Sequence, residues 1–286
     1  MTINDIYFKY IGSFKEANLS ESSLRILLCE IFKFQSMSEL ELNRDKDVTL
    51  KAKDEELINK ALKGIPVQYL VHKASFYNMD FYVDKRVLIP RPETEELVYE
   101  TIKKINETFI FFKKPINIYD LGTGSGCIAI ALDKTLNLDH KVYAYDKSLQ
   151  ALAVAIKNNK RLNASVEFKR GNILKEISFP TKINVLISNP PYIENVNEID
   201  KNVFDYEPHV ALLSKPGTLF YEKILENCRV FLEKPFILAF EIGYDQKEKI
   251  ENYLKINQYY RENTKWEVKK DMEGKDRFLF IESLWN

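Results

Sequence analysis

The chain has 286 residues, of which 45% are hydrophobic and 13% aromatic, and 42 Lys and Arg balance 42 Asp and Glu. This composition is typical of a folded globular protein and argues against a disordered chain. Proteins that grip nucleic acid non-specifically usually carry a basic surplus, so the zero net charge argues against stable nucleic-acid binding without excluding a DNA or RNA substrate.

The first part of the chain, residues 1–72, is predicted to be a small helical domain. Ser20 can cap a helix from Glu21 to about Phe34, and a second helix, from Lys53 to Lys63, ends before Gly64. The apolar face of the first helix contains Leu24, Leu27, Leu28, Ile31 and Phe32. Because no catalytic constellation is visible here, we expect a structural or docking role.

Residues 73–92 are predicted to form a connector with a β-hairpin. Short aromatic stretches, Phe76-Tyr77 and Phe81-Tyr82-Val83, flank Asn78-Met79-Asp80. Pro92 then suits the first position of a helix from Glu93 to about Glu107, and the acidic residues of its first turn suit the helix dipole.

Residues 93–286 alternate apolar strands with helices, which predicts an α/β fold with a doubly wound, mostly parallel seven-stranded sheet. The expected parallel strands are Ile116–Leu121, Lys141–Asp146, Val166–Lys169, Ile183–Asn189 and Phe236–Glu241. The helices between them are expected near Gly126–Leu136, Leu149–Asn159 and Thr218–Leu232. At the end of the chain, Trp266–Lys270 and Arg277–Glu282 are predicted to form an antiparallel hairpin.

A glycine-rich turn follows the first strand of this sheet. The turn contains Gly122, Thr123, Gly124, Ser125 and Gly126. Its glycines allow a sharp turn and a close approach to a ligand, but the spacing is neither the GxGxxG dinucleotide fingerprint nor a phosphate loop. Asp146 ends the second strand, where an acidic residue typically binds ribose hydroxyls. Together these features predict an adenosine-type cofactor that needs no pyrophosphate cradle, which S-adenosylmethionine satisfies.

Asn172 lies just past the third strand and is a candidate for contact with the adenine edge, with Ile173 as an apolar wall. An asparagine in a turn is equally natural without a ligand, so both interpretations of Asn172 stay open.

The tetrapeptide Asn189-Pro190-Pro191-Tyr192 closes the fourth strand. Ligands of parallel sheets bind beyond the carboxyl ends of the strands, so this motif is expected in the same crevice as the glycine turn. The Asn189 side-chain oxygen and the Pro190 carbonyl can accept from a planar N–H group, and Tyr192 can pack on its face. We therefore predict methyl transfer from the cofactor to a nitrogen, with no metal required.

The cysteines Cys29, Cys127 and Cys228 are far apart and form no CxxC pair, which argues against a disulfide framework or a zinc site. The three histidines are scattered without ligand spacing. The amino terminus does not resemble a signal peptide, and no apolar run approaches the ~20 residues of a membrane span. These features favour a cytoplasmic protein without a membrane or metal partner.

With these motifs the chain resembles the HemK/PrmC family of methyltransferases, which modify the glutamine of the Gly-Gly-Gln motif in peptide chain release factors. The similarity extends from about Gly64 to Glu282 and is most specific in the run Leu88-Ile89-Pro90-Arg91-Pro92-Glu93-Thr94-Glu95. It also includes Tyr206-Glu207-Pro208 and Glu241-Ile242-Gly243. The segment Lys215–Leu219 and the pair Val71-His72 depart from the family pattern.

The resemblance implies a class I methyltransferase fold and a set of site residues. Gly122 to Gly126, Asp146 and Ile173 would contact S-adenosylmethionine. Asn172 and Asn189 are further candidates for that contact. Asn189, Pro190, Pro191 and Tyr192 would hold the glutamine amide, and Phe76, Arg91 and Glu93 would line the same crevice. The helical domain would help to dock the release factor.

Two alternatives remain open at this point. One is an enzyme that methylates exocyclic amines of DNA or RNA bases, since Asn-Pro-Pro-Tyr is shared with such enzymes. The other is a scaffold that binds the cofactor and a partner without catalysis.

Overall fold

The computed structural model describes residues 1–175 and 177–284. It divides into two compact units. The first contains residues 1–73 together with residues 201–206, and the second contains residues 74–200 together with the chain from residue 207 onward. The short segment 201–206 therefore groups with a unit whose other residues come more than a hundred positions earlier in the sequence.

The first unit is helical. Its helices are α1 (Ile3–Glu16), α2 (Glu21–Phe32), α3 (Met37–Leu42), α4 (Ala52–Leu62), α5 (Val67–Val71) and α9 (Lys201–Tyr206). Ser20 caps α2 as predicted, since its hydroxyl accepts from the Ser23 N–H at 3.2 Å. Leu24, Leu27 and Leu28 have no exposed surface and lie in one apolar cluster with residues of α1 and α4.

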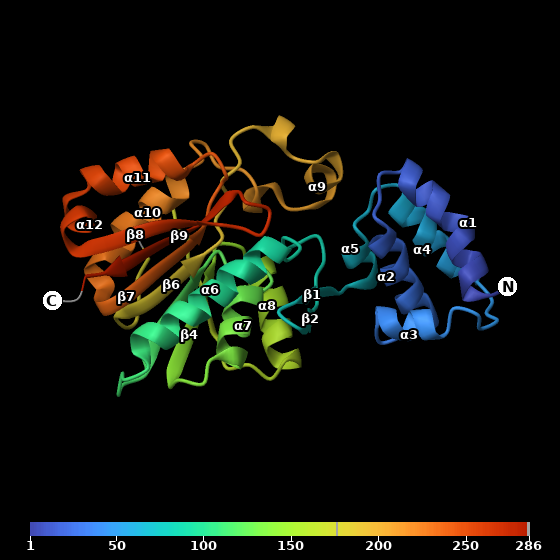
Figure 1. Ribbon diagram of the computed structural model, residues 1–286, viewed down its shortest axis with the longest axis horizontal. Helices are drawn as coiled ribbons and strands as arrows, with labels where there is room; N and C mark the ends of the chain where they lie inside the picture. Colours follow the sequence, from blue (N-terminus) through green and yellow to red (C-terminus); the bar gives the residue numbers. More distant parts are fainter. Residues whose placement is uncertain (176, 285–286) are drawn as a thin grey trace. The chain divides into compact units, whose positions relative to one another are not determined.

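The second unit is built on a seven-stranded sheet with the order β5-β4-β3-β6-β7-β9-β8 (Figure 1). Its strands are β3 (Ile116–Leu121), β4 (His140–Asp146), β5 (Glu167–Arg170), β6 (Ile183–Ser188), β7 (Leu232–Glu241), β8 (Thr264–Lys270) and β9 (Asp276–Ser283). The pairs among β3 to β7 are parallel, whereas β9 is antiparallel to both β7 and β8. The predicted fold class, including the antiparallel carboxyl-terminal hairpin, is confirmed. The connector hairpin consists of β1 (Ala74–Phe76) and β2 (Met79–Phe81).

Helices cover both faces of the sheet (Figure 1). One side has α6 (Pro92–Phe109), α7 (Cys127–Thr135) and α8 (Leu149–Arg161); the other has α10 (Leu219–Cys228), α11 (Lys247–Ile256) and α12 (Gln258–Asn263). Alternate strand residues enter two separate apolar clusters. Ile118 packs with residues of α6 and α7, whereas Tyr119 packs in the cluster that contains residues of α10 and α11. This arrangement explains why the central strands read as continuous apolar runs.

The predicted boundary between α10 and β7 is wrong. α10 ends at Cys228, a short 3₁₀ helix spans Arg229–Phe231, and β7 begins at Leu232 rather than Phe236. The β6–β7 register is irregular between Ile183 and Val185, and Pro235 lies in the opposing stretch. Pro235 has no N–H to donate and would interrupt a regular hydrogen-bond ladder, but the irregular register accommodates it. β7 therefore continues through this proline, whereas prolines usually mark the end of a strand. The other 3₁₀ helices are Val196–Glu198 and His209–Ala211.

Because β3, β4, β5, β6 and β7 run parallel, their carboxyl ends lie along one edge of the sheet. Those ends are Leu121, Asp146, Arg170, Ser188 and Glu241. Across residues 1–175 and 177–284, none of the helices combines the length and apolar character that a membrane span needs.

Candidate active site

The glycine turn after β3 is tied to the end of β4. The N–H groups of Gly122 and Thr123 both donate to the Tyr145 carbonyl, at 2.8 and 2.9 Å. Gly126 has φ +83°, and a Cβ atom there would lie 3.1 Å from the Cβ atom of Ala155 on α8. Glycine at this position therefore provides both a left-handed backbone and a close approach between the turn and a helix.

Asn158 of α8 also fixes this turn, and the sequence patterns did not single it out. Its buried side-chain amide donates to the carbonyls of Ser125 and Tyr82, both at 2.9 Å, and its oxygen accepts from the Tyr82 N–H at 2.7 Å. One asparagine thus joins the glycine turn to the segment that follows the connector hairpin.

Two carboxyl groups flank the turn. The buried Asp120 accepts from the Thr123 hydroxyl at 2.6 Å, and burial raises the pKa of Asp120 to about 7. Asp146 accepts from the N–H groups of Gly124 at 3.0 Å and Ser148 at 2.8 Å. Burial also raises the pKa of Asp146, against the opposing effect of these donors.

These elements border one cleft at the carboxyl edge of the sheet. Among the predicted cofactor residues, the cleft is lined by Gly122, Gly124, Asp146, Asn172, Ile173 and Asn189. Thr123, Ser125 and Gly126 are buried behind the turn rather than in the lining. Asn172 forms its own turn, because its side-chain oxygen accepts from the Leu174 N–H at 3.1 Å.

The tetrapeptide Asn189–Tyr192, called the acceptor motif below for its predicted role, enters the same cleft through Asn189 and Pro191. Ser188, just before it, donates to the Leu121 carbonyl and so holds the end of β6 against the end of β3. Pro190 is buried and Tyr192 is half-buried. The sheet edge thus brings the glycine turn, Asp146 and Asn189 together, as their positions at strand ends predicted.

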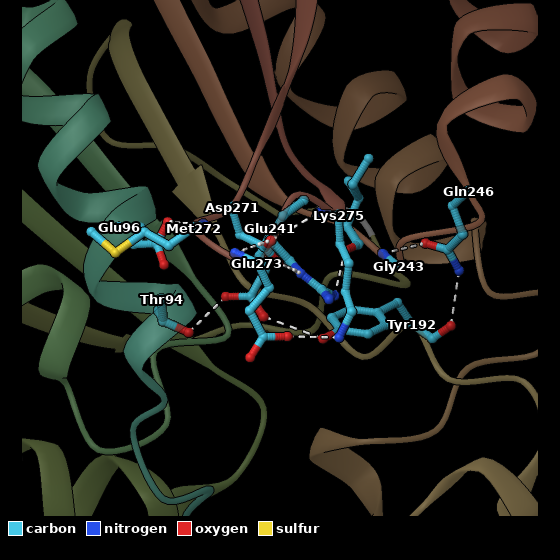
Figure 2. A network of polar contacts seen from close by, with 12 residues as sticks. Thr94, Glu96, Tyr192, Glu241, Gly243, Gln246, Asp271, Met272, Glu273 and Lys275 are labelled. Carbon is cyan, nitrogen blue, oxygen red and sulfur yellow. Dashed lines mark hydrogen bonds and ion pairs between the residues drawn. The ribbon is translucent and has the colours of Figure 1, made fainter.

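A buried carboxyl group, Glu241, lies beside the Tyr192 side chain (Figure 2). Its side chain accepts from the Thr94 hydroxyl at 2.6 Å and from the Tyr192 hydroxyl at 3.2 Å. Thr94 in turn accepts from the Asn189 side-chain amide at 3.0 Å. Neither Thr94 nor Glu241 was a predicted site residue, although Glu241 ends a predicted strand at this edge of the sheet.

The backbone around Tyr192 is held separately. Gln246 donates to the Tyr192 carbonyl at 2.9 Å and accepts from the Gly243 N–H at 3.0 Å (Figure 2). Tyr221 donates to the Glu241 carbonyl at 3.1 Å. Burial raises the pKa of Tyr192, and the neighbouring Glu241 charge adds to that effect. Tyr192 is therefore a neutral hydrogen-bond donor at neutral pH.

The remaining predicted substrate residues occupy different environments. Arg91 pairs with the buried Glu207, which also accepts from the Ile89 N–H at 3.0 Å. This pair anchors a segment whose next residue, Pro208, lines the cleft. Glu93 is partly exposed in the first turn of α6. Phe76 has no exposed surface and packs edge-on against Phe81 in the core, so the structure does not place it in the cleft.

The fold and this site define a methyltransferase. A family model described as "Methyltransferase small domain" matches residues 102–220. Among solved structures, a methyltransferase from Pyrococcus furiosus is similar with a TM-score of 0.52 and 18% identity, over 82% of this chain and 98% of the other. A human methyltransferase 10 domain containing protein gives a TM-score of 0.53 at 15% identity, over 73% and 91% of the two chains. At these identities the likeness concerns the fold.

Curated relatives narrow the class. A release factor glutamine methyltransferase from Bacillus anthracis is 36% identical over 284 residues, covering 96% of this chain and 97% of the relative. One from Flavobacterium psychrophilum is 41% identical over 221 residues, covering 76% and 75%. The chain belongs to the release factor glutamine methyltransferase family.

Proposed function

We propose that this enzyme methylates the side-chain amide nitrogen of the glutamine in the Gly-Gly-Gln motif of peptide chain release factors, with S-adenosylmethionine as methyl donor. Family membership supports the reaction class and the substrate. The structural observation that carries the proposal is the presence of Asn189 in the same cleft as Gly122 and Asp146. The groups proposed to bind the methyl donor and the acceptor therefore border one cleft.

The cleft residues suit this cofactor. A Cβ atom on Gly124 would meet nothing within 4 Å, so the unsubstituted turn leaves open space beside the Asp146 carboxylate. Two backbone N–H groups already orient that carboxylate, which leaves it as an acceptor for ribose hydroxyls. Ile173 and Asn172 would border the adenine. When bound, S-adenosylmethionine supplies an electrophilic methyl group on a sulfonium sulfur.

Asn189, Pro190 and Tyr192 would act on the acceptor. An amide nitrogen is a poor nucleophile because its lone pair is delocalised. The Asn189 side-chain oxygen and the Pro190 carbonyl would accept from its N–H groups, which orients the nitrogen and stabilises positive charge that develops on it. The Tyr192 ring would pack on the planar amide, with Pro191 alongside. Arg91 and Glu93 would border the peptide that carries the glutamine.

Release factors act in translation, so we place the reaction in the cytoplasm. The helical first unit would supply docking contacts to the release factor, and we expect no stable complex with nucleic acid because the chain carries no net charge.

A labelling experiment tests the substrate. The purified chain is incubated with methyl-labelled cofactor and, separately, with a release factor, the same factor with its Gly-Gly-Gln glutamine replaced by alanine, duplex DNA and ribosomal RNA. We expect label only on the unaltered release factor. Label confined to nucleic acid would support a base methyltransferase, and cofactor binding without any transfer would support a scaffold.

A substitution tests the role of Asn189. Asn189→Ala should lower kcat by roughly 10²-fold or more, by analogy with the loss of one oxyanion-hole donor. Calorimetry should give a cofactor Kd within a few-fold of the parent. Asn197→Ala, at an exposed position of the same loop, is the matched control and should leave kcat unchanged. Full activity in Asn189→Ala would contradict the assignment.

A further inference from the structure

Glu241, Thr94 and Asn189 form a chain of hydrogen bonds that links three distant parts of the sequence. Glu241 ends β7, Thr94 lies in the first turn of α6, and Asn189 follows β6. Thr94 and Glu241 are 147 positions apart, and Asn189 and Thr94 are 95 apart. Glu241 is 3% exposed and Thr94 is 3% exposed, so water does not compete for these bonds.

When Glu241 is ionised, the chemistry of the three groups fixes the direction of every bond. An ionised carboxylate only accepts, so the single proton of the Thr94 hydroxyl goes to Glu241. The distance of 2.6 Å suits such a charge-assisted bond. The Thr94 oxygen can then only accept from Asn189, and the group of Asn189 that donates is its NH₂. The side-chain oxygen of Asn189 consequently points away from Thr94.

We propose that Glu241 and Thr94 are positioning residues that set the orientation of the Asn189 amide and hold the Tyr192 ring through its hydroxyl. The inference rests on the proposed function, in which the Asn189 oxygen accepts from the substrate amide. With the opposite orientation, the NH₂ group of Asn189 would face the N–H groups of the substrate, and donors would oppose donors.

Groups from α6, β9 and the Asn189–Tyr192 tetrapeptide surround the Glu241 carboxyl group. Burial raises the pKa of Glu241 and the nearby Glu93 adds to that effect, whereas the Thr94 bond and Arg277 from β9 oppose it. The main chain does not depend on this carboxylate, since Tyr221 holds the Glu241 carbonyl and Gln246 holds the Tyr192 carbonyl. A change to the Glu241 side chain therefore alters hydrogen-bond direction without removing these anchors.

Three variants test this chain of hydrogen bonds from Glu241 through Thr94 to Asn189, which we call the relay. Thr94→Val keeps the shape of the side chain but removes the hydroxyl, and should lower kcat by roughly 10-fold or more while the cofactor Kd stays within a few-fold. Thr94→Ser restores the hydroxyl and should recover kcat to within about 3-fold of the parent. In Glu241→Gln a side-chain amide replaces an obligate acceptor, so kcat should fall by a similar factor to that of Thr94→Val.

Thr101→Val is the matched control. Thr101 is also fully buried on α6, but its hydroxyl donates only to Leu97 of the same helix, at 2.7 Å. This variant should keep the parent kcat. An equal loss of kcat in Thr101→Val and Thr94→Val, or a failure of Thr94→Ser to recover activity, would assign the effect to packing and overturn the relay.

A substrate-free measurement separates the relay from the proposed function. In protein labelled with ¹⁵N-asparagine, the Asn189 side-chain NH₂ signal should shift and exchange faster with water in Thr94→Val than in the parent, but not in Thr101→Val. If the parent modifies no release factor while this pattern holds, the proposed function is wrong and the relay stands. An unchanged Asn189 signal in Thr94→Val would overturn the relay whatever the substrate.

Discussion

Asp120 is a single carboxyl group whose burial has a consequence for stability. It lies beneath the glycine turn with no exposed surface, and its pKa is raised to about 7 from an ordinary value of 3.8. Between those two pH values the folded protein holds a proton that the unfolded chain has released. The free energy of unfolding contributed by this group therefore falls as the pH rises through that window.

Asp120→Asn removes this titration. From about pH 5 to about pH 8 the parent should lose roughly 3 kcal/mol of unfolding free energy relative to the variant, since one pKa unit corresponds to ~1.4 kcal/mol. Urea unfolding of both proteins at the two pH values measures the difference. Parallel pH profiles would mean that Asp120 does not titrate in this range.

Glu241 predicts a pH dependence of catalysis. Its pKa is raised above the ordinary 4.5 by burial, and the groups around it are Thr94, Glu93, Arg277 and Tyr192. As the pH falls through the raised pKa, Glu241 gains a proton and can donate to Thr94. The Thr94 hydroxyl can then donate to Asn189, so the direction of both hydrogen bonds can reverse. We expect kcat to fall on the acid side at a higher pH than an ordinary glutamate would give.

The control for this fall in kcat at acid pH, the acid limb of the profile, is Glu241→Gln. Its kcat should be low at every pH and its profile should lack the acid limb. An acid limb of unchanged position in the variant would assign it to another group. Measurements at saturating cofactor and release factor keep the profile on kcat rather than on binding.

At the scale of elements, the glycine turn offers a test in which strain and crowding can be separated. Gly126 and Gly274 have nearly the same backbone angle, φ +83° and +82°. A Cβ atom on Gly126 would lie 3.1 Å from the Ala155 Cβ, whereas one on Gly274 would meet nothing within 4 Å. Both positions share the cost of the left-handed backbone, and only one adds a steric conflict.

Gly126→Ala should destabilise the protein by more than Gly274→Ala, for which we expect about 1–2 kcal/mol from backbone strain alone. The turn would also move, so cofactor affinity should fall in Gly126→Ala and stay unchanged in Gly274→Ala. Thermal unfolding and calorimetry with the cofactor measure the two effects. Equal losses of stability would show that Ala155 moves aside from the new Cβ atom without a measurable loss of unfolding free energy.

The elements also show how far the sequence alone could lead. The strands and the cleft-lining residues Gly122, Asp146 and Asn189 follow from apolar runs and from the rule that ligands bind beyond strand ends. Thr94 and Glu241 were not predicted as site residues because their pairing depends on how the start of α6 packs against the end of β7. No local sequence pattern encodes that packing. Phe76 was predicted to line the crevice from family resemblance, but its alternation with the exposed Ser75 equally suits a core residue.

At the scale of the whole molecule, α9 comes late in the sequence but belongs to the first unit. It is six residues long and groups with the helical unit, where the Tyr206 hydroxyl donates to the Lys63 carbonyl at 3.2 Å. Gly64, next in the chain, has φ +93°, and a Cβ atom there would lie 2.5 Å from the side-chain oxygen of Asn202. Glycine at this position therefore permits the close packing of α9.

Gly64→Ala should loosen α9 through both backbone strain and this close contact. We expect faster hydrogen exchange of residues 201–206 by mass spectrometry and a lower kcat/KM with a whole release factor, with the cofactor Kd unchanged. Gly12→Ala is the control, because Gly12 lies in α1 with nothing near its Cβ position. Unaltered exchange in Gly64→Ala would show that Asn202 moves aside freely.

The assignment of residues 201–206 to the first unit also bears on how this protein can be divided or recombined. The polypeptide passes between the two units after residues 73, 200 and 206. A protease that cuts once near residue 73 would therefore leave one helix of the amino-terminal unit on the larger fragment. For the same reason, an exchange of the first 73 residues between relatives would be incomplete unless residues 201–206 were exchanged with them.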